Sequence, residues 1–530
     1  MPLLPAAHPG CLGDLAMRNR LLLFFWCAAL CAATLSAAAL PASVDAVRPP
    51  AVAGAFYPAD GTELVQMVDG FLAKVPADPI KDLVALVSPH AGYPFSGHVA
   101  AYSYAQLKGR PIERVVVIAP SHYDPFTFVS IFDGAAYSTP LGRVPIDQAF
   151  SRKLAAASPL LKLSDRGHKP AGEWREHALE VQLPFLQRVL GHFELVAIIM
   201  GNQDYDSCRA LGLALAKLIT GPGTMIIASS DLSHYHTYDQ AVRLDRKTLG
   251  AIQEWDYLAM SRNFAQDIWE ACGGGPIIAA MIAAERLGAH RAQVLKYANS
   301  GDVTPDRSRV VGYGAVAFSR APAAAAAVPR FDLAPEERAE LLRIARASVE
   351  TVVKERKEYQ LPAAKFEALS RERGVFVTLK KHGDLRGCIG YVSPLKPLDH
   401  AVRDVAAFAA VRDQRFRPVM PAELPELSYE ISVLSPMRRV LDVQQIRPGR
   451  DGLLVRRDGS EGLLLPQVAT EEGWDRTRFL EETCVKAGLM PQTWRDDLTD
   501  IFSFTALVFG DRERPRPPEP RSPQTSARQF

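Results

Sequence analysis

The sequence predicts an α/β N-terminal domain, with a mainly parallel sheet between flanking helices, followed by an α+β domain. Three observations lead to this fold class. Short apolar strands alternate with helical stretches through the first half of the chain. The second half opens with a long amphipathic helix and continues with several strands and a hairpin signal. Between the halves, residues 321–330 form a simple Ala/Pro segment that is typical of a linker.

The first domain is predicted to span residues 48–320. Segments rich in Val, Ile and Leu that stop at Pro, Gly or Ser predict buried strands; they are residues 83–87, 114–119, 195–200 and 224–229. Helical patterns lie between and after them, at residues 176–190, 207–220 and 276–287. Ligands of parallel sheets bind beyond the carboxyl ends of the strands. The expected site is therefore in the polar segments that follow three of the strands, residues 88–93, 120–122 and 230–236.

The second domain is predicted to span residues 331–513. Its first helix covers residues 335–358, and further helices are expected at residues 398–410 and 475–487. Strands are expected at residues 374–380, 386–391, 430–433 and 452–457. The turn signal Asp458-Gly459 predicts a hairpin that returns through residues 461–465. Residues 514–530 are rich in Pro, Arg and Ser, which predicts a disordered tail.

The N-terminal residues 1–43 predict a leader with a signal peptide. Arg18 and Arg20 precede an apolar run, and small residues follow it, as in secretory signals. We therefore expect an exported, periplasmic protein. An uncleaved membrane anchor is the alternative, because the run approaches the roughly 20 residues that cross a bilayer. No later segment is apolar enough to span a membrane, so we expect no span in the mature chain.

Charge and cysteine content argue against a nucleic-acid-binding protein and against a disulfide-rich one. The formal net charge of +2 gives no general case for a nucleic-acid partner. Cleavage near residue 43 would leave Cys208, Cys272, Cys388 and Cys484, which are scattered and include no C-x-x-C pair. This is not the pattern of a disulfide framework. A free thiolate in an oxidising compartment would need protection by burial or by a metal.

Three segments carry one good transition-metal ligand each. His90 and His122 each follow a predicted strand, and Cys272 precedes three glycines and the helix that begins at Pro276. Two imidazoles and a thiolate suit iron, copper or zinc and leave coordination positions open. A thiolate at a helix N-terminus is expected to have a lowered pKa. The alternatives are hydrogen-bonded loop histidines and a buried, inert cysteine.

Two further polar segments are candidates for the same site. Asp231 could orient an imidazole or bind the metal, and His234 could act as an acid or base. Ser230 or Asp231 could also cap a helix, and the capping and site interpretations can both hold. Glu176 and Glu180 would share one face of a helix that starts near residue 173, with His177 aimed at the site. An exposed charged first turn is the alternative there.

Five motifs in this order resemble those of the Memo family, whose bacterial members are called AmmeMemoRadiSam system protein B. They are Pro-His-Ala-Gly-Tyr (89–93), Pro-Ser-His (120–122), Glu-His-x-x-Glu (176–180), Ser-Ser-Asp-x-x-His (229–234) and Cys-Gly-x-x-Pro (272–276). The resemblance covers about residues 48–318. It implies a fold similar to that of the class III extradiol dioxygenases, whose iron is held by two histidines and a glutamate.

The resemblance also implies roles for the candidate residues. His90, His122 and Cys272 match the metal ligands of the family, and Asp231, His234 and His177 would line the pocket as catalytic residues. Cysteine in place of the dioxygenase glutamate makes the site softer, so we expect iron or copper rather than zinc. These features suggest a metal-dependent oxidoreductase. The alternative is a non-catalytic protein that binds or handles copper or iron.

The second domain carries Leu-Arg-Gly-Cys-Ile-Gly at residues 385–390. Taken by itself, this predicts a closely packed Gly-containing strand, or else a site for an anion or a reactive thiol at Arg386 and Cys388. The motif resembles the AMMECR-type domain, AmmeMemoRadiSam system protein A, over about residues 332–512. That family has no settled activity, so the roles of both residues stay undefined.

Partners follow from the same resemblance and from the charge pattern. The name of the system implies a radical S-adenosylmethionine enzyme, and this chain lacks the Cys-x-x-x-Cys-x-x-Cys motif of such enzymes, so that partner would be a separate protein. Arg386, Arg412, Arg415 and Arg417 could form a basic face. Because aromatic platforms are sparse there, we do not expect nucleic acid. A small molecule or peptide is the expected substrate class, and a scaffold that binds a peptide or nucleotide near Arg386 is a further alternative.

Overall fold

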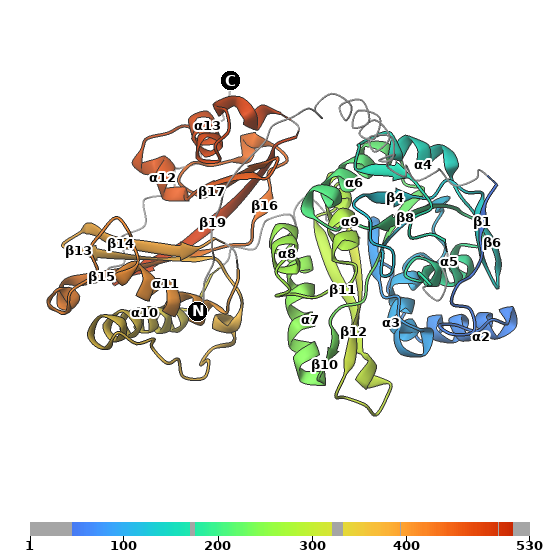
Figure 1. The fold of residues 1–530 in the computed structure, drawn as a ribbon, viewed down its shortest axis with the longest axis horizontal. Helices are drawn as coiled ribbons and strands as arrows, with labels where there is room; N and C mark the ends of the chain where they lie inside the picture. Colours follow the sequence, from blue (N-terminus) through green and yellow to red (C-terminus); the bar gives the residue numbers. More distant parts are fainter. Residues whose placement is uncertain (1–44, 170–174, 321–331, 393, 497, 512–530) are drawn as a thin grey trace, which may run out of the picture.

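The computed structural model describes residues 45–169, 175–320, 332–392, 394–496 and 498–511. Two α/β bodies lie side by side, the first coloured blue to yellow-green and the second yellow to red in Figure 1. The predicted leader, the predicted linker and the predicted tail lie outside the described residues. Among the helices that are described, none is long and apolar enough to cross a membrane.

The first domain is built on a mixed sheet with the strand order β10-β12-β2-β9-β3-β8-β4-β7, and β11 adds to β12. Its four central strands are parallel and match the four predicted ones; they are β2 (Leu83–Ser88), β9 (Thr224–Ser229), β3 (Arg114–Pro120) and β8 (Glu194–Met200). The outer strands are β4 (Val129–Ile131), β7 (Leu161–Leu163), β10 (His234–His236), β11 (Arg291–Asn299) and β12 (Val310–Ser319).

The prediction of a mainly parallel sheet is therefore only partly right. The central strands are parallel, but the outer strands add antiparallel pairs on both sides. β4 runs antiparallel to β8, and β12 runs antiparallel to β2, β10 and β11. The connection from β11 to β12 is residues 300–309, too short for the helical crossover that a parallel pair needs. A small separate sheet joins β1 (Val47–Arg48), β5 (Ala136–Thr139) and β6 (Gly142–Pro145).

Helices cover both faces of the large sheet, so that successive residues of the central strands alternate between two hydrophobic cores. The core on one face includes α2 (Gly61–Leu72), α3 (Tyr93–Ala105) and α5 (Leu183–Leu190). The other includes α4 (Gln148–Ala155), α6 (Tyr205–Leu218), α7 (Tyr238–Gln253), α8 (Tyr257–Phe264) and α9 (Gly274–Arg286).

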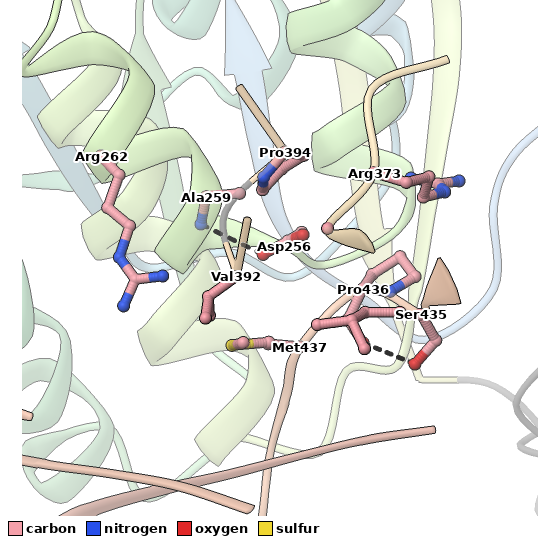
Figure 2. A pocket seen from close by; sticks show the side chains of 11 residues that line it. Asp256, Ala259, Arg262, Arg373, Val392, Pro394, Ser435, Pro436 and Met437 are labelled. Carbon is pink, nitrogen blue, oxygen red and sulfur yellow. Dashed lines mark hydrogen bonds between the residues drawn. The ribbon is translucent and has the colours of Figure 1, made fainter. Parts of the chain in front are cut away.

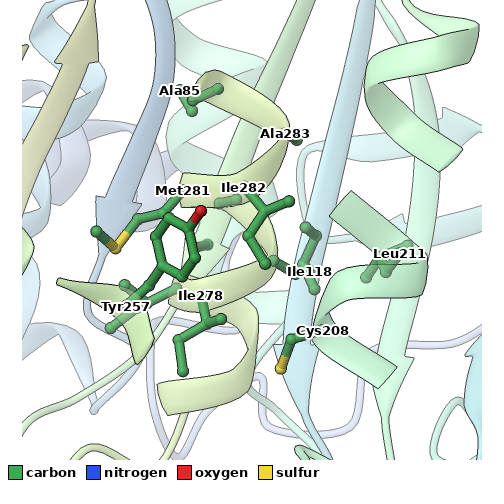
Figure 3. Close-up of a cluster of buried hydrophobic side chains, with 14 of the residues drawn as sticks. Ala85, Ile118, Cys208, Leu211, Tyr257, Ile278, Met281, Ile282 and Ala283 are labelled. Atoms are coloured by element: carbon green, nitrogen blue, oxygen red, sulfur yellow. The ribbon is translucent and has the colours of Figure 1, made fainter. Parts of the chain in front are cut away.

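Helix α9 lies at the centre of the second of these cores, with nearly all of its residues buried. Figure 3 shows Ile278, Met281 and Ile282 of α9 among side chains of the sheet and of α6. A Cβ atom at Gly212 of α6 would lie 2.8 Å from Ile282, so this glycine allows the two helices to pack closely. The start of α9, which follows Cys272, is therefore held firmly by its packing.

The predicted helix over residues 176–190 begins later than expected. The structure has a 3₁₀ turn at Glu180–Gln182 and then α5, whereas residues 175–177 are irregular. The reason is that the carboxylate of Glu176 accepts hydrogen bonds from the backbone nitrogens of His177 and Ala178. This local turn replaces the first helical turn, so Glu176 and Glu180 do not share a helix face.

The second domain has a sheet with the order β14-β13-β15-β19-β17-β18, with β16 added to β19, and the strand pairs of its described residues are antiparallel. The strands are β13 (Val375–Lys381), β14 (Asp384–Tyr391), β15 (Leu427–Leu434), β16 (Arg438–Arg439), β17 (Asp451–Arg457), β18 (Ser460–Leu464) and β19 (Asp500–Gly510). The helices are α10 (Pro335–Glu355), α11 (Leu398–Val411), α12 (Pro466–Glu471) and α13 (Arg476–Lys486).

Most predicted elements of this domain are present, and the predicted hairpin at Asp458-Gly459 is confirmed by the pairing of β17 with β18. Helix α10 ends at Glu355, earlier than expected, because Arg356 adopts a left-handed conformation. The sequence analysis missed β19, which pairs with β15, β16 and β17 and so joins the two parts of the sheet.

The two domains share a hydrophobic cluster. Leu434, Met437, Phe502 and Phe504 of the second domain belong to the same buried core as α6, α8 and α9. Figure 2 shows a cavity at this boundary, lined by Asp256 and its neighbours on α8 and by residues of the second domain. Its volume of about 20 Å³ has room for one water molecule, so the cavity is not a substrate site.

Candidate metal centre

Three predicted ligands meet at the carboxyl edge of the large sheet. His90 follows β2, His122 follows β3, and Cys272 directly precedes the start of α9. One ligand atom from each lies within 4.8 Å of the others, and His90 Nε2 is 3.1 Å from Cys272 Sγ. The two imidazole rings meet edge to face, with 5.1 Å between their centroids. His90 is buried, whereas the side chain of His122 is 24% exposed, so the cluster is accessible from the side of His122.

The hydrogen bonds around Ser229 fix the tautomer of His90. The Ser229 hydroxyl donates to the carbonyl of Ala178 at 2.6 Å and accepts from Nε2 of Gln182 at 2.7 Å. It can therefore only accept from His90 Nδ1, which lies 2.8 Å away. With the proton on Nδ1, the Nε2 lone pair of His90 is free to bind a metal. Burial, followed by the neighbouring imidazoles, lowers the pKa of His90 well below its usual value and keeps the ring neutral.

Glu176 has the same effect on His122. Its carboxylate accepts from the backbone nitrogen of His122 at 2.6 Å and lies 3.1 Å from His122 Nδ1. A carboxylate only accepts, so Nδ1 carries the proton and Nε2 is left as the donor to a metal. Burial would raise the pKa of Glu176, but the hydrogen bond and charge of His122 lower it to about 2. Burial opposes the charge on His122, but Glu176 outweighs it and raises the pKa of that imidazole.

Cys272 differs from its prediction. Burial, followed by the charge of Asp231, raises the pKa of the Cys272 thiol well above its usual value. The expected lowering by the helix N-terminus is therefore wrong for the metal-free protein, because desolvation outweighs the helix. The backbone nitrogen of Asp231 donates to Sγ at 3.3 Å. A Cβ atom at Gly273 would lie 2.2 Å from the carbonyl of Ser229, so only glycine permits this close approach.

Asp231 stabilises the turn that carries His90. Its Oδ1 accepts from the backbone nitrogens of His90 at 2.8 Å and Ala91 at 3.3 Å, and its Oδ2 lies 3.9 Å from His90 Nε2. Burial raises the pKa of Asp231 to about 6. The alternative in which Asp231 caps a helix is wrong, since β9 is followed by the short strand β10 and the next helix is capped by Thr237.

Two more histidines lie at the cluster. The ring of His177 stacks on that of His122 with 5.0 Å between centroids, and its Nδ1 is 3.4 Å from the carbonyl of Arg175. Burial lowers the pKa of His177 to about 4. His234 Nδ1 lies 2.9 Å from the carbonyl of Leu232, and the charge of His234 acts on both His90 and Asp231. In both rings Nδ1 faces a carbonyl, so Nε2 is again the basic nitrogen.

The structure therefore gathers all six predicted site residues of the first domain at one edge of the sheet. Sequence reasoning missed the partners that orient the ligands. Glu176 was assigned only to a charged helix face, and Ser229 and Gln182 were given no role. Polar residues also lie near Gln182, at Glu180, Gln187 and Arg188, so its amide gave no distinct signal in the sequence. His122, Glu176 and His177 also meet the geometric condition for a metal cluster. Because that group shares His122 with the first, both describe one centre.

The motif of the second domain lies in a packed strand. A Cβ atom at Gly387 would lie 2.1 Å from the carbonyl of Ala409 on α11, so the strand and helix pack too closely for any side chain there. Arg386 forms two hydrogen bonds of 3.0 Å with the carboxylate of Glu423. The backbone nitrogen of Cys388 donates to Asp413 at 2.8 Å.

The arginines predicted to form a basic face are partly neutralised by nearby acids. Arg386 pairs with Glu423, and Arg415 pairs with Asp413, which also receives the hydrogen bond from Cys388. Arg412 lies over the ring of Phe408. The motif is therefore explained by packing and ion pairs, as the strand interpretation of the sequence suggested.

Comparisons with known proteins match both domains. The model of the Memo-like protein family matches residues 48–317, and the AMMECR1 model matches residues 342–509. A MEMO1 family protein of Methanopyrus kandleri is 39% identical over 287 residues, which is 52% of this chain and 99% of that protein. A MEMO1 family protein of Nitrosopumilus maritimus is 34% identical over 278 residues, 51% of this chain and 99% of that protein. The crystal structure of an uncharacterized protein from Pyrococcus horikoshii is 42% identical, with a TM-score of 0.31, over 34% of this chain and 93% of that one.

Proposed function

Because the chain belongs to the Memo-like protein family and also carries an AMMECR1 domain, we propose that its first domain binds iron or copper and uses the metal in redox chemistry. The ligands in this proposal are His90, His122 and Cys272. We also propose that the fold of this domain is similar to that of the class III extradiol dioxygenases. Cys272 would stand where those enzymes have a glutamate.

One observation carries the proposal: both imidazoles are held with Nδ1 protonated, which leaves Nε2 as the nitrogen that can bind a metal. Ser229 does this for His90 and Glu176 for His122. Metal-ligating histidines are oriented by outer partners of this kind. Two imidazole nitrogens with a thiolate suit a soft or borderline transition metal. The residues present therefore fit the group that the family resemblance implies.

A bound iron or copper ion would supply electron transfer and would polarise a substrate oxygen. The protein's own groups would move protons. His234 holds its Nδ1 proton on the carbonyl of Leu232, so its Nε2 is the base that can accept a proton from a substrate near the metal. Asp231, beside His90 Nε2, holds the His90 turn in place and adds negative charge. The ring of His177 lies between those of His122 and Phe56, with 5.0 Å and 4.4 Å between the ring centroids.

A second candidate function is metal handling without turnover. It is favoured by the same compact donor set, in which Cys272 Sγ and His90 Nε2 are only 3.1 Å apart, because a thiolate ligand prefers reduced copper. In either case we propose a separate radical S-adenosylmethionine enzyme as the partner and export as the localisation, with a small molecule or peptide as the substrate class.

Elemental analysis of protein purified without oxygen tests the proposed metal centre. We expect about one equivalent of iron or copper, lost in Cys272→Ala and retained in the matched variant Cys388→Ala, whose cysteine lies in the second domain. Absence of metal in all three proteins after reconstitution would contradict the proposal. Metal-dependent oxygen consumption, lost in Cys272→Ala, would favour the redox function, and stoichiometric binding without turnover would favour metal handling.

A further inference from the structure

The segment that carries Cys272 contacts the second domain. It connects α8 to α9, and its residue Trp269 is buried in the core that the two domains share. The indole Nε1 of Trp269 donates a 2.7 Å hydrogen bond to the carboxylate of Glu372, which belongs to the second domain. Trp269 is three residues from the thiol, so this bond anchors the segment close to the ligand.

Glu372 is well placed to act as an anchor. Its side chain is only 5% exposed, and its second oxygen pairs with Nζ of Lys247 on α7. The carboxylate is thus held between a cation and a neutral donor, both from the first domain. Hydrogen bonds to a buried charged group are stronger than those between neutral groups. Loss of Glu372 would leave the indole nitrogen of Trp269 buried without this acceptor.

A second set of contacts holds the same segment through Gln203, which lies just before α6. Gln203 donates from Nε2 to the carbonyl of Cys272 at 3.0 Å and accepts from the backbone nitrogen of Gly275 at 2.8 Å. Two residues later, the hydroxyl of Tyr205 donates to Asp500 of the second domain at 3.0 Å. Asp500 also accepts from Arg209 at 2.7 Å. The second domain therefore holds the Cys272 segment directly through Glu372 and indirectly through the start of α6.

The segment also touches the histidine side of the site. Glu270, between Trp269 and Cys272, accepts from the backbone nitrogen of His234 at 3.2 Å and lies 2.7 Å from His236 Nε2. Displacement of Trp269 would move Glu270 and Cys272 together. Small misplacements of a ligand are costly because metal sites need a defined geometry.

From this arrangement we infer that Glu372 is a positioning residue through which the second domain holds Cys272 at the metal centre. The inference rests on the proposed metal centre for its function, but the mechanical link can be measured without a metal. Through Glu372, the second domain would help to set the geometry of a metal site whose ligands all lie in the first domain. The two domains would then work as one metal-binding unit.

The test compares Glu372→Ala with two controls in the metal-free full chain. Glu372→Gln keeps an oxygen that can accept from Trp269. Glu461→Gln removes a different interdomain ion pair, the one between Glu461 and Arg262 of α8. The readout is the alkylation rate of Cys272, measured by peptide-resolved mass spectrometry with Cys388 as the internal reference. Trp269→Phe, which removes the donor instead, replaces Glu372→Ala if that variant does not fold.

We expect Cys272 to react about tenfold faster in Glu372→Ala, since the lost hydrogen bond to a charged group opens the segment by about that factor. Glu461→Gln should react like the wild type, and Glu372→Gln should react more slowly than Glu372→Ala because its amide oxygen still accepts from Trp269. An unchanged rate in Glu372→Ala, or an equal increase in Glu461→Gln, would overturn the inference.

A second readout, titration with Co²⁺, separates this inference from the proposed function. The thiolate charge-transfer band should appear with about tenfold weaker affinity in Glu372→Ala and recover in Glu372→Gln. No Co²⁺ binding in any protein, together with faster alkylation in Glu372→Ala, would refute the metal centre and leave the positioning role intact.

Discussion

Nδ1 of His122 lies 3.1 Å from Oε1 of Glu176, a carboxylate that is buried and also accepts from the backbone nitrogen of His122. The pair comes from two distant segments, and Glu176 is held by backbone donors of its own turn. A carboxylate–histidine pair of this kind makes the opposite ring nitrogen a better electron donor. The partially exposed candidate ligand His122 is thus oriented by a buried acid.

Replacing Glu176 should therefore weaken metal binding without removing a ligand. For Glu176→Gln we expect about 10- to 100-fold lower affinity, because an amide neither fixes the tautomer of His122 nor adds charge as the carboxylate does. Equilibrium titration with Co²⁺ measures this. Glu63→Gln, an exposed acid in the first turn of α2, serves as the control and should bind like the wild type. Equal affinities for both variants would mean that Glu176 has no part in ligation.

Metal binding should release a proton from Cys272. Burial raises the pKa of this thiol well above its usual value, so the metal-free protein holds the proton at neutral pH. Ligation by the thiolate displaces it, and apparent affinity should rise about tenfold per pH unit near neutrality. Proton release on Co²⁺ addition in weakly buffered solution measures the effect directly. In Cys272→Ser the hydroxyl keeps its proton, so release should fall by about one proton per metal ion; an unchanged release would assign the proton to another group.

The strand ends could be predicted from the sequence because they depend on local patterns. An apolar run followed by Pro-His or Pro-Ser-His identifies His90 and His122 as residues at the edge of a sheet. Hydrogen-bond partners from remote segments leave no local signal. Ser229 and Gln182 orient His90, and Glu372 contacts Trp269 from the other domain. Nothing in the spacing of these residues along the chain indicates that they meet.

The errors in the predicted fold have separate physical causes. β19 depends on partners from three other strands, β15, β16 and β17, that are far from it in the chain. The predicted helix start at Glu176 fails because the Glu176 carboxylate accepts hydrogen bonds from the backbone nitrogens of the next two residues. The pKa of Cys272 depends on burial, which the position before a helix does not reveal.

Gly387 should be required for packing in the second domain. Gly387→Ala would place a methyl group 2.1 Å from the carbonyl of Ala409, and we expect destabilisation of about 1–3 kcal/mol or more. Gly250→Ala in α7 is the matched control, since no atom lies within 4 Å of its added Cβ. There we expect up to about 1 kcal/mol of stabilisation. Thermal unfolding of both variants measures the contrast, and similar melting temperatures would refute the packing explanation.

Glu285 on α9 should make the free energy of unfolding depend on pH, because its carboxyl group is buried in the folded protein and exposed to solvent in the unfolded one. Burial raises its pKa from 4.5 to about 7, although the hydroxyl of Tyr257 and nearby arginines oppose the shift. From about pH 4.5 to 7 the native state binds more protons than the unfolded state, so the free energy of unfolding falls as pH rises. At about 1.4 kcal/mol per pKa unit, the loss over this window is on the order of 3 kcal/mol.

Glu285→Gln isolates this contribution, because its amide oxygen can still accept from Tyr257 but cannot ionise. The variant should match the wild type near pH 4.5 and be more stable by up to about 3 kcal/mol at pH 8. Urea unfolding across this range gives the difference. Burial also raises the pKa of Asp245 and of Asp256 to about 6, which adds the same slope to both proteins and cancels in the comparison. Parallel curves for the two proteins would mean that Glu285 is ionised in the folded state at no energetic penalty, and that the charges of Arg439 and Arg286 compensate for its burial.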